Sequence, residues 1–176
     1  KIVVASTYLE QAEELGKSLA DMLQEHVEPS TVLSLDRHQD ADIIITLLPQ
    51  FQLAMQYVPD AEIVGVTLQP PYEVLEKVAH LSAGDTVGVV VQDKDAVTAI
   101  ADEIRLLAGF QGQVVSIPIE TESRRLEMLI RQVDLVLYTP QVRRRLRPVL
   151  KDHPSAILEP KLTTEAANQV RLVAGR

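Results

Sequence analysis

Short apolar runs alternate with longer amphipathic segments along the whole chain. The apolar runs are rich in Val and Ile, and they predict strands at 2–6, 31–35, 42–47, 62–68, 86–92, 113–119, 134–139 and 155–159. Between the strands, residues 8–26 place Leu15 and Leu19 on one helical face, and residues 95–109 have the same periodicity. This alternation is typical of a parallel α/β fold.

The second half of the chain repeats the pattern of the first. With an offset of 85 residues, the core positions of the first helix in each half coincide. Farther along, "ADIIITLLP" resembles "VDLVLYTPQ", and Ile63 coincides with Ile157. The pattern predicts two similar lobes, each a small parallel β-sheet flanked by helices, with a cleft between them. The alternative is that any two α/β segments can be brought into rough register.

Two consecutive prolines mark the boundary between the lobes, because they interrupt a strand and reset the backbone before a helix. We expect residues 1–69 to form lobe 1 and residues 70–176 to form lobe 2, with a linking helix at 71–82. A C-terminal helix at 163–175 coincides with that linking helix in the repeat. Our hypothesis is that the C-terminal helix packs back on lobe 1.

Composition and charge narrow the function. The chain has 176 residues, of which 46% are hydrophobic, so a core or two small cores can form. A formal net charge of −8 and the absence of Trp argue against direct binding to nucleic acid. No apolar run is long enough to cross a membrane, and a chain without Cys suits the cytoplasm. Because a strand-like run starts directly at a Lys, we expect the natural chain to continue upstream.

Polar side chains lie at the carboxyl ends of several of the predicted strands or directly after them. Parallel strands end at the same edge of a sheet, so these side chains are expected to meet a ligand there. Hydroxyl and amide groups suit hydrogen bonds to a small polar molecule. The candidate ligand-binding residues are Ser6, Thr7, Tyr8, Thr46, Gln50, Thr67, Gln92, Asp93, Tyr138 and Thr139.

These candidates also have ordinary structural explanations. Thr7 begins a T-x-x-E capping box for a helix that starts at residue 8, which leaves Ser6 as the better ligand candidate. Thr46 and Thr139 suit strand ends, and Tyr138 suits a core with a locally satisfied hydroxyl. Both explanations stay open at this point.

Two charged stretches suggest other chemistry. In "DRHQD", His38 stands between Asp36 and Asp40, as a general base or a metal ligand would, but no second His is nearby and charged turns are usually solvated. The stretch "VRRRLR" places Arg143, Arg144 and Arg147 on much of one helical face. That face either binds an anionic group or is solvated, and we favour the second.

The sequence has no nucleotide-binding motif, neither G-x-G-x-x-G nor G-x-x-x-x-G-K-[ST]. Racemases of the aspartate/glutamate type have a similar two-lobed plan, but that resemblance implies two catalytic cysteines, which are absent from this sequence. We therefore expect no catalytic residue, no metal and no cofactor, and we expect that the protein is not an enzyme.

Three stretches carry a family resemblance: "KIVVASTYLEQAEELGKSLADML" (1–23), the segment 41–94 and "VDLVLYTPQVRRRLRPVL" (133–150). In texture and element order they resemble the region that follows the winged helix in some bacterial GntR-type transcription regulators. The resemblance implies a periplasmic-binding-protein-like domain that dimerises, binds a small polar metabolite and reaches DNA only through an upstream winged helix. Effector binding would then bias the spacing of two DNA-binding domains.

Two other classes remain as alternatives. A solute-binding protein of a transport system would use the same architecture behind an upstream signal segment. An enzyme that works through His38 with Asp36 or Asp40 would need these side chains to point into the cleft.

Overall fold

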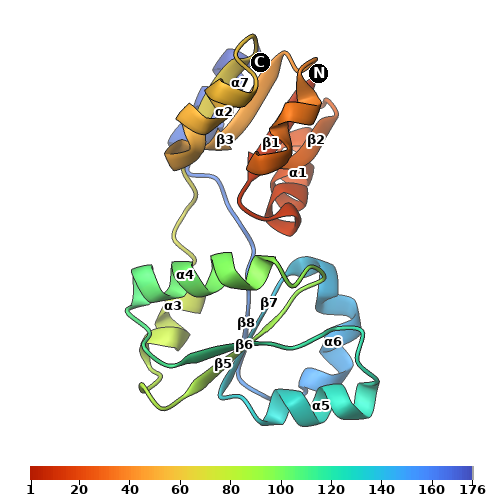
Figure 1. The fold of residues 1–176 in the computed structure, drawn as a ribbon, viewed down its shortest axis with the longest axis vertical. Helices are drawn as coiled ribbons and strands as arrows, with labels where there is room; N and C mark the ends of the chain where they lie inside the picture. Colours follow the sequence, from red (N-terminus) through yellow and green to blue (C-terminus); the bar gives the residue numbers. More distant parts are fainter. Residues whose placement is uncertain (176) are drawn as a thin grey trace. The chain divides into compact units, whose positions relative to one another are not determined.

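The computed structural model describes residues 1–175 and divides the chain into two compact units. Unit 1 contains Lys1–Pro70 and the segment that starts at Pro160, and unit 2 contains Pro71–Glu159 (Figure 1). The chain therefore passes from one unit to the other twice, each time at a proline. The predicted boundary after residue 69 lies one residue before the first passage.

Unit 1 is built on a four-stranded parallel sheet in the order β2-β1-β3-β4. Its elements are β1 (Ile2–Ser6), α1 (Leu9–Leu23), β2 (Val27–Thr31), η1 (Val32–His38), β3 (Ile43–Leu47), η2 (Leu48–Gln50), α2 (Phe51–Tyr57), β4 (Glu62–Val66) and α7 (Thr164–Val173), where η denotes a 3-10 helix.

Unit 2 is built on a second four-stranded parallel sheet, in the equivalent order β6-β5-β7-β8. Its elements are α3 (Tyr72–Ala79), β5 (Thr86–Val90), α4 (Ala96–Ala108), β6 (Gln113–Ser116), α5 (Ser123–Arg131), β7 (Leu135–Tyr138), η3 (Pro140–Val142), α6 (Arg143–Leu150) and β8 (Ser155–Ile157). The predicted α/β fold with two similar units, each a parallel sheet flanked by helices, is confirmed.

Helices cover both faces of the unit 1 sheet. Leu15, Leu19 and Leu23 recur every four residues on α1, so they lie on one face of the helix and pack on the sheet. The same core cluster includes Ala166 and Val170 of α7. On the other face, η1 and α2 form a separate core cluster with β1 and β3.

Helices also enclose the unit 2 sheet. Leu126 and Ile130 of α5, and Leu146 and Leu150 of α6, form one core cluster with the sheet. The other face is covered by α3 and α4, which pack against each other (Figure 1). This division follows from right-handed crossovers, because the chain adds β6 on one side of β5 and then β7 on the other.

One helix of each unit comes from the other half of the sequence. α7 follows β8 but packs against β4, whereas α3 follows β4 but packs against β7 and β8. An antiparallel bridge between Leu68 and Leu162 joins the two connecting segments within unit 1. The hydroxyls of Thr67 and Thr163 are 2.9 Å apart beside this bridge. Both passages of the chain are thus anchored at unit 1 by hydrogen bonds.

One predicted strand is misplaced. The strand expected at 31–35 lies at Val27–Thr31, and the chain from Val32 onwards forms η1. Val32 and Leu35 are three residues apart, which is the 3-10 period, and both are buried. Pro29 lies inside the observed strand, which is tolerated because β2 is at the edge of the sheet.

The predicted register of the repeat is wrong at the last strand. Ile44 pairs with Ile63, and Val136 pairs with Ser155, so Ile63 is equivalent to Ser155 and not to Ile157. The shift of two residues preserves which side chains face each side of the sheet, because the strand period is two. The hydrophobic pattern could not reveal it for that reason.

Within residues 1–175, none of the helices combines the length and the hydrophobicity that a membrane span requires.

Candidate functional site at the carboxyl edges of the sheets

Each sheet has a point at which the chain reverses the direction in which it adds strands. It lies between β1 and β3 in unit 1 and between β5 and β7 in unit 2. The loops after these strands leave toward opposite faces, so ligands of open α/β sheets bind at such points. Most of the predicted ligand-binding residues lie in or next to these loops.

At the switch point of unit 1, the polar side chains bind one another. Gln50 Nε2 donates a hydrogen bond to Thr7 Oγ1 over 2.8 Å, which joins the loops after β1 and β3. Ser6 is fully buried, and its hydroxyl donates to the amide oxygen of Gln11. Ser6 was the preferred ligand candidate, but in this conformation a ligand would have to displace Gln11 to reach it.

The predicted capping box at the start of α1 is not formed. Tyr8 is the N-cap residue and makes no side-chain capping bond, while the Thr7 hydroxyl accepts from Gln50. Tyr8 itself is buried. Local spacing suggested the box for a helix that starts at residue 8, but α1 starts at Leu9, so Thr7 is not the N-cap residue. Its hydroxyl instead accepts from Gln50, which the switch point brings close from η2.

Thr46 and Thr67 occupy different environments in unit 1. Thr46 is fully buried on β3, and its Oγ1 has no hydrogen-bond partner among residues 1–175. Thr67 is exposed, and its hydroxyl pairs with that of Thr163, which also caps α7. Thr67 therefore contributes to the connection between the two chain passages, and Thr46 is a buried core residue.

At the carboxyl edge of unit 2, two adjoining hollows are open to solvent. They have volumes of about 770 and 420 Å³. Gln92, Ile119 and Glu120 line both of them. The larger hollow is also lined by Gln141, Val142, Arg144 and Arg145, and the smaller one by Val91, Asp93, Lys94, Ser116 and Pro118.

Local structure positions the polar lining of these hollows. Gln92 and Asp93 follow β5, and the Asp93 carboxylate accepts a hydrogen bond of 3.0 Å from the backbone N–H of Asp95. Gln141 lies in η3, directly after β7. The structure therefore brings together residues from three separate loops, including Gln92 and Asp93 of the predicted set. Glu120 and Gln141 follow strands too, but they were not among the predicted ligands.

Tyr138 and Thr139 do not line either hollow. Tyr138 packs against the core cluster under α5 and α6, and Thr139 is almost completely buried. Both residues therefore have the structural role that the sequence left open: Tyr138 packs in the core, and Thr139 lies at the end of a strand. The neighbouring Gln141 and Arg144 present the polar groups at this edge instead.

The arginine cluster is split by the geometry of α6. Arg144 and Arg145 line the larger hollow, whereas Arg143 and Arg147 do not. The sequence grouped Arg144 with Arg143 and Arg147 and overlooked Arg145. Arg145 extends toward the loop after β6, where Nη2 lies 3.5 Å from the carbonyl oxygen of Thr121. Only the fold brings that loop to α6.

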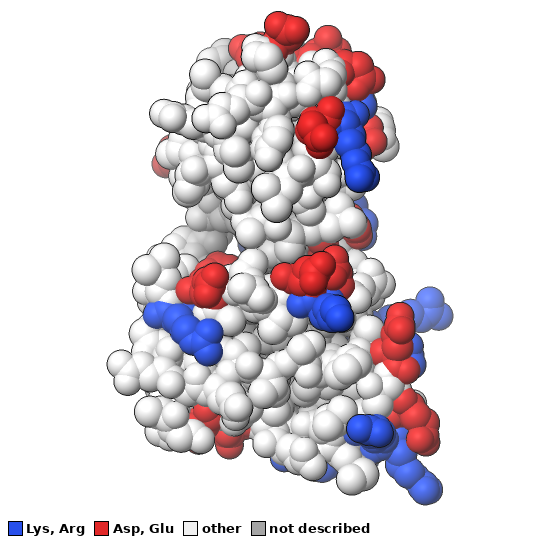
Figure 2. All heavy atoms as spheres, in the orientation of Figure 1, with Lys and Arg blue, Asp and Glu red and all other residues white. Residues whose placement is uncertain are grey.

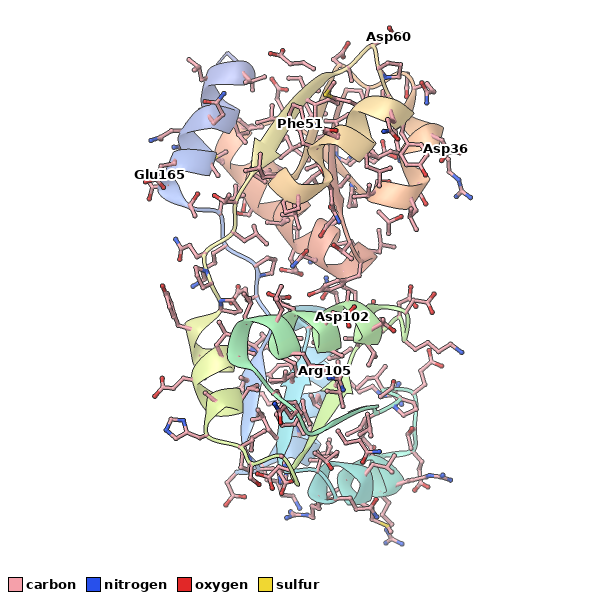
Figure 3. The ribbon with its side chains drawn as sticks, turned by 60° about the vertical axis from the view of Figure 1, so that its left-hand side comes forward. Asp36, Phe51, Asp60, Asp102, Arg105 and Glu165 are labelled. Carbon is pink, nitrogen blue, oxygen red and sulfur yellow. The ribbon has the colours of Figure 1, made fainter. Side chains whose placement is uncertain are left out.

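His38 lies at the amino edge of the unit 1 sheet, near Lys1 at the start of β1. Its Nδ1 is 4.0 Å from Glu28 Oε1, too far for a hydrogen bond, while Asp40 pairs with Lys1 Nζ at 2.8 Å. Asp36 extends from the outer surface of η1 (Figure 3). The pairing of His38 with Asp36 or Asp40 is therefore not formed, and His38 is at the edge opposite the switch point.

A third hollow, of about 480 Å³, follows the edge strand β2 and includes His38 in its lining.

Within residues 1–175, no group of three His, Asp or Glu side chains is arranged to hold a metal ion. Figure 2 shows basic and acidic side chains interspersed on the face of unit 2 in view, without a broad basic surface there.

No protein-family model matches the sequence, and a search of curated proteins found no significant match. Among solved structures, the chain is similar to glutamate racemase from Escherichia coli in complex with L-glutamate and an activator, with 11% identity, a TM-score of 0.44 and coverage of 100% of this chain and 83% of that chain. It is also similar to a transcription regulator-like protein from Staphylococcus haemolyticus, with 10% identity, a TM-score of 0.38 and coverage of 89% and 78%.

The similarity to glutamate racemase corrects one expectation. The sequence led us to expect that the protein is not an enzyme, but one of the structures to which it is similar belongs to an enzyme. The expectation is withdrawn.

Proposed function

We propose that the chain is the small-molecule effector-binding domain of a bacterial transcription regulator of the GntR type, active in the cytoplasm as a homodimer. One observation carries the ligand-binding half of the proposal: the adjoining hollows at the carboxyl edge of unit 2, where three loops contribute polar side chains. The regulatory half rests on the family resemblance of the sequence. In this proposal the chain contacts DNA only through a separate winged helix.

The lining suits a small polar ligand. The side-chain amides of Gln92 and Gln141 each provide both a donor and an acceptor, and Glu120 provides an acceptor. Ile119 and Val142 form an apolar wall beside them. A few convergent polar groups against such a wall orient a ligand, as in most small-molecule sites.

Regulation then follows from linkage. An effector that binds one conformation of the regulator more tightly than another shifts the population toward the first. The shift is limited by the difference in binding free energy, and typical couplings are about 1 to 3 kcal/mol. Such a difference would change operator affinity by about 5-fold to 150-fold.

The first test is a thermal-shift screen of the chain against sugars, amino acids, carboxylates and phosphorylated metabolites. A ligand that binds only the folded state raises the melting temperature by mass action. Gln92→Ala should weaken the response because this exposed side chain lines both hollows. Gln111→Ala is the matched control, since Gln111 is an exposed amide outside both hollows.

A response that is lost in Gln92→Ala and kept in Gln111→Ala would support the site. A screen without any stabilising ligand would remove the ligand-binding half of the proposal. Each stabilising ligand is then incubated with the protein and followed by NMR. Chemical conversion of the ligand would show that the protein is an enzyme and not a sensor. With the full-length protein, operator affinity that is unchanged by the ligand would remove the regulatory half.

A further inference from the structure

Two guanidinium groups reach the larger hollow of unit 2. Arg144 and Arg145 line it, and Glu120 is the only carboxylate in its lining as the structure describes it. The chain as a whole has a formal charge of −8. The hollow is therefore locally positive on an acidic protein, which favours an anionic ligand at this place over the rest of the surface.

The fold selects these two arginines from a run of neighbours. The leucines of α6 that face the core recur every four residues, which fixes the rotation of the helix about its axis. Arg143 and Arg147 are also four residues apart, so they share one flank and lie outside the hollow. Arg144 and Arg145 are left on the side that meets the loop after β6.

Neither of these arginines is held by a carboxylate. In the described part of the chain, Arg144 has no ion-pair partner, and the contact of Arg145 with Thr121 is a 3.5 Å approach to a carbonyl oxygen. On the neighbouring helix α5, Arg131 instead pairs with Glu127 at 3.3 Å. The donors of Arg144 and Arg145 are thus available to a ligand, and a guanidinium matches the paired oxygens of a carboxylate or phosphate.

We infer that the larger hollow of unit 2 binds a ligand through an anionic group, a phosphate or a carboxylate, which Arg144 and Arg145 hold together. This inference rests on the proposed function and specifies the effector's chemical class. Gln92 and Gln141 bind the uncharged part of the ligand. Glu120 lines both hollows, so the part of the ligand near it carries a hydrogen-bond donor and not a second negative charge.

The test uses inorganic phosphate and acetate as probes, each titrated into the 176-residue chain at constant ionic strength set with chloride. Binding is followed by the NMR signals of the arginine Nε–H groups. We expect saturable shifts for Arg144 and Arg145 with at least one probe. Arg144→Gln should weaken binding about tenfold or more, because a charge-assisted hydrogen bond is lost. Arg147→Gln is the matched control and should leave the affinity within about twofold, since it changes the same charge on the same helix.

The two probes separate the sources of the anionic group. Saturable binding of phosphate alone supports a phosphorylated effector, and binding of acetate alone supports a carboxylate. Shifts that are linear and nonsaturable for both probes would overturn the inference, as would equal weakening by Arg144→Gln and Arg147→Gln.

Failure of this inference differs from failure of the proposed function. A neutral metabolite whose binding depends on Gln92 and not on Arg144 would keep the sensor and overturn the anion site. Conversely, inorganic phosphate could bind saturably while no phosphorylated metabolite changes the operator affinity of the full-length protein. That result would support the anion site and contradict the sensor function.

Discussion

The two units share a strand order but fill the carboxyl end of the sheet with different side chains. In unit 1, Ala5 lies between Ser30 and Thr46, and Thr46 lies beside Gly65. This row of small residues lets the next elements approach closely. A Cβ at Gly65 would come within 2.7 Å of a Leu48 side-chain carbon.

In unit 2 the equivalent row consists of large side chains. Val90 lies beside Tyr138, which lies beside Ile157, and Ile117 belongs to the same core cluster as Val90. The loops above this row leave the two hollows open. In unit 1, the hydrogen bond from Gln50 to Thr7 joins the loops after β1 and β3 at the switch point. One topology thus supports a closed edge in unit 1 and an open edge in unit 2.

The largest expected effect comes from giving unit 2 the small residue of unit 1. Ile117→Ser removes a buried aliphatic side chain and leaves a hydroxyl in its place. We expect the free energy of unfolding, measured by urea denaturation, to fall by about 3 kcal/mol or more. The reciprocal change, Ser30→Ile, should cost about 1 to 3 kcal/mol through overpacking. If both variants kept wild-type stability, the difference in side-chain size between the two rows would not contribute to the stability of either unit.

The helices exchanged between the units differ in their caps. Thr163 Oγ1 accepts from the backbone N–H of Ala166 at 3.2 Å and so caps α7, whereas the equivalent N-cap of α3 is Pro71, which makes no such bond. Thr163→Ala should lower the free energy of unfolding by about 1 to 2 kcal/mol. Thr163→Ser, which keeps the hydroxyl, is the control and should restore most of the loss. An equal loss in both variants would show that the cap is not the cause.

The buried hydroxyl of Thr46 should respond in the opposite direction. The Oγ1 atom of Thr46 is buried and has no hydrogen-bond partner in residues 1–175. Thr46→Val therefore removes a hydroxyl that loses its hydrogen bonds to water on folding and gains none in the protein. We expect the free energy of unfolding, measured by urea denaturation, to rise by about 1 kcal/mol. Destabilisation by a similar amount would instead reveal a hydrogen bond made through a buried water molecule.

The smallest effect concerns α5 of unit 2, which stands where unit 1 has η1. Hydrogen bonds from Lys151 and Arg131 lower the pKa of Glu127. A lowered carboxyl pKa adds stability above the pKa of the unfolded chain, and that stability is lost as pH falls through the folded value. The melting temperature of the wild-type protein should therefore be slightly higher than that of Glu127→Gln at pH 7. The two melting temperatures should become equal in acid. A difference that persists at pH 2 would assign the effect to packing.

Hydrophobic periodicity was sufficient to predict the two sheets and most of their helices, because burial of apolar faces determines both. It failed at β2, where the observed strand contains Pro29 and only the edge position makes this acceptable. It also failed by two residues at β8, since a shift of one strand period leaves the facing of the side chains unchanged. Both errors concern pairing, which depends on distant parts of the chain.

The candidate site was predictable in position but less so in composition. Knowing where parallel strands end was enough to select Gln92 and Asp93. The sequence could not show that Ser6 is buried against Gln11 or that Tyr138 belongs to the core. Both are the last residues of strands, so from the sequence they are as close to the carboxyl edge as Gln92 is. Arg145 reaches the site only because α6 lies beside the loop after β6.

The most direct test of the contrast between the units is hydrogen–deuterium exchange of the chain with a ligand identified by the thermal-shift screen. The account predicts that protection is greatest in peptides that cover residues 91–94, 117–122 and 140–146, the loops around the two hollows. Protection concentrated at residues 28–38, along the third hollow, or at the switch point of unit 1 would contradict it.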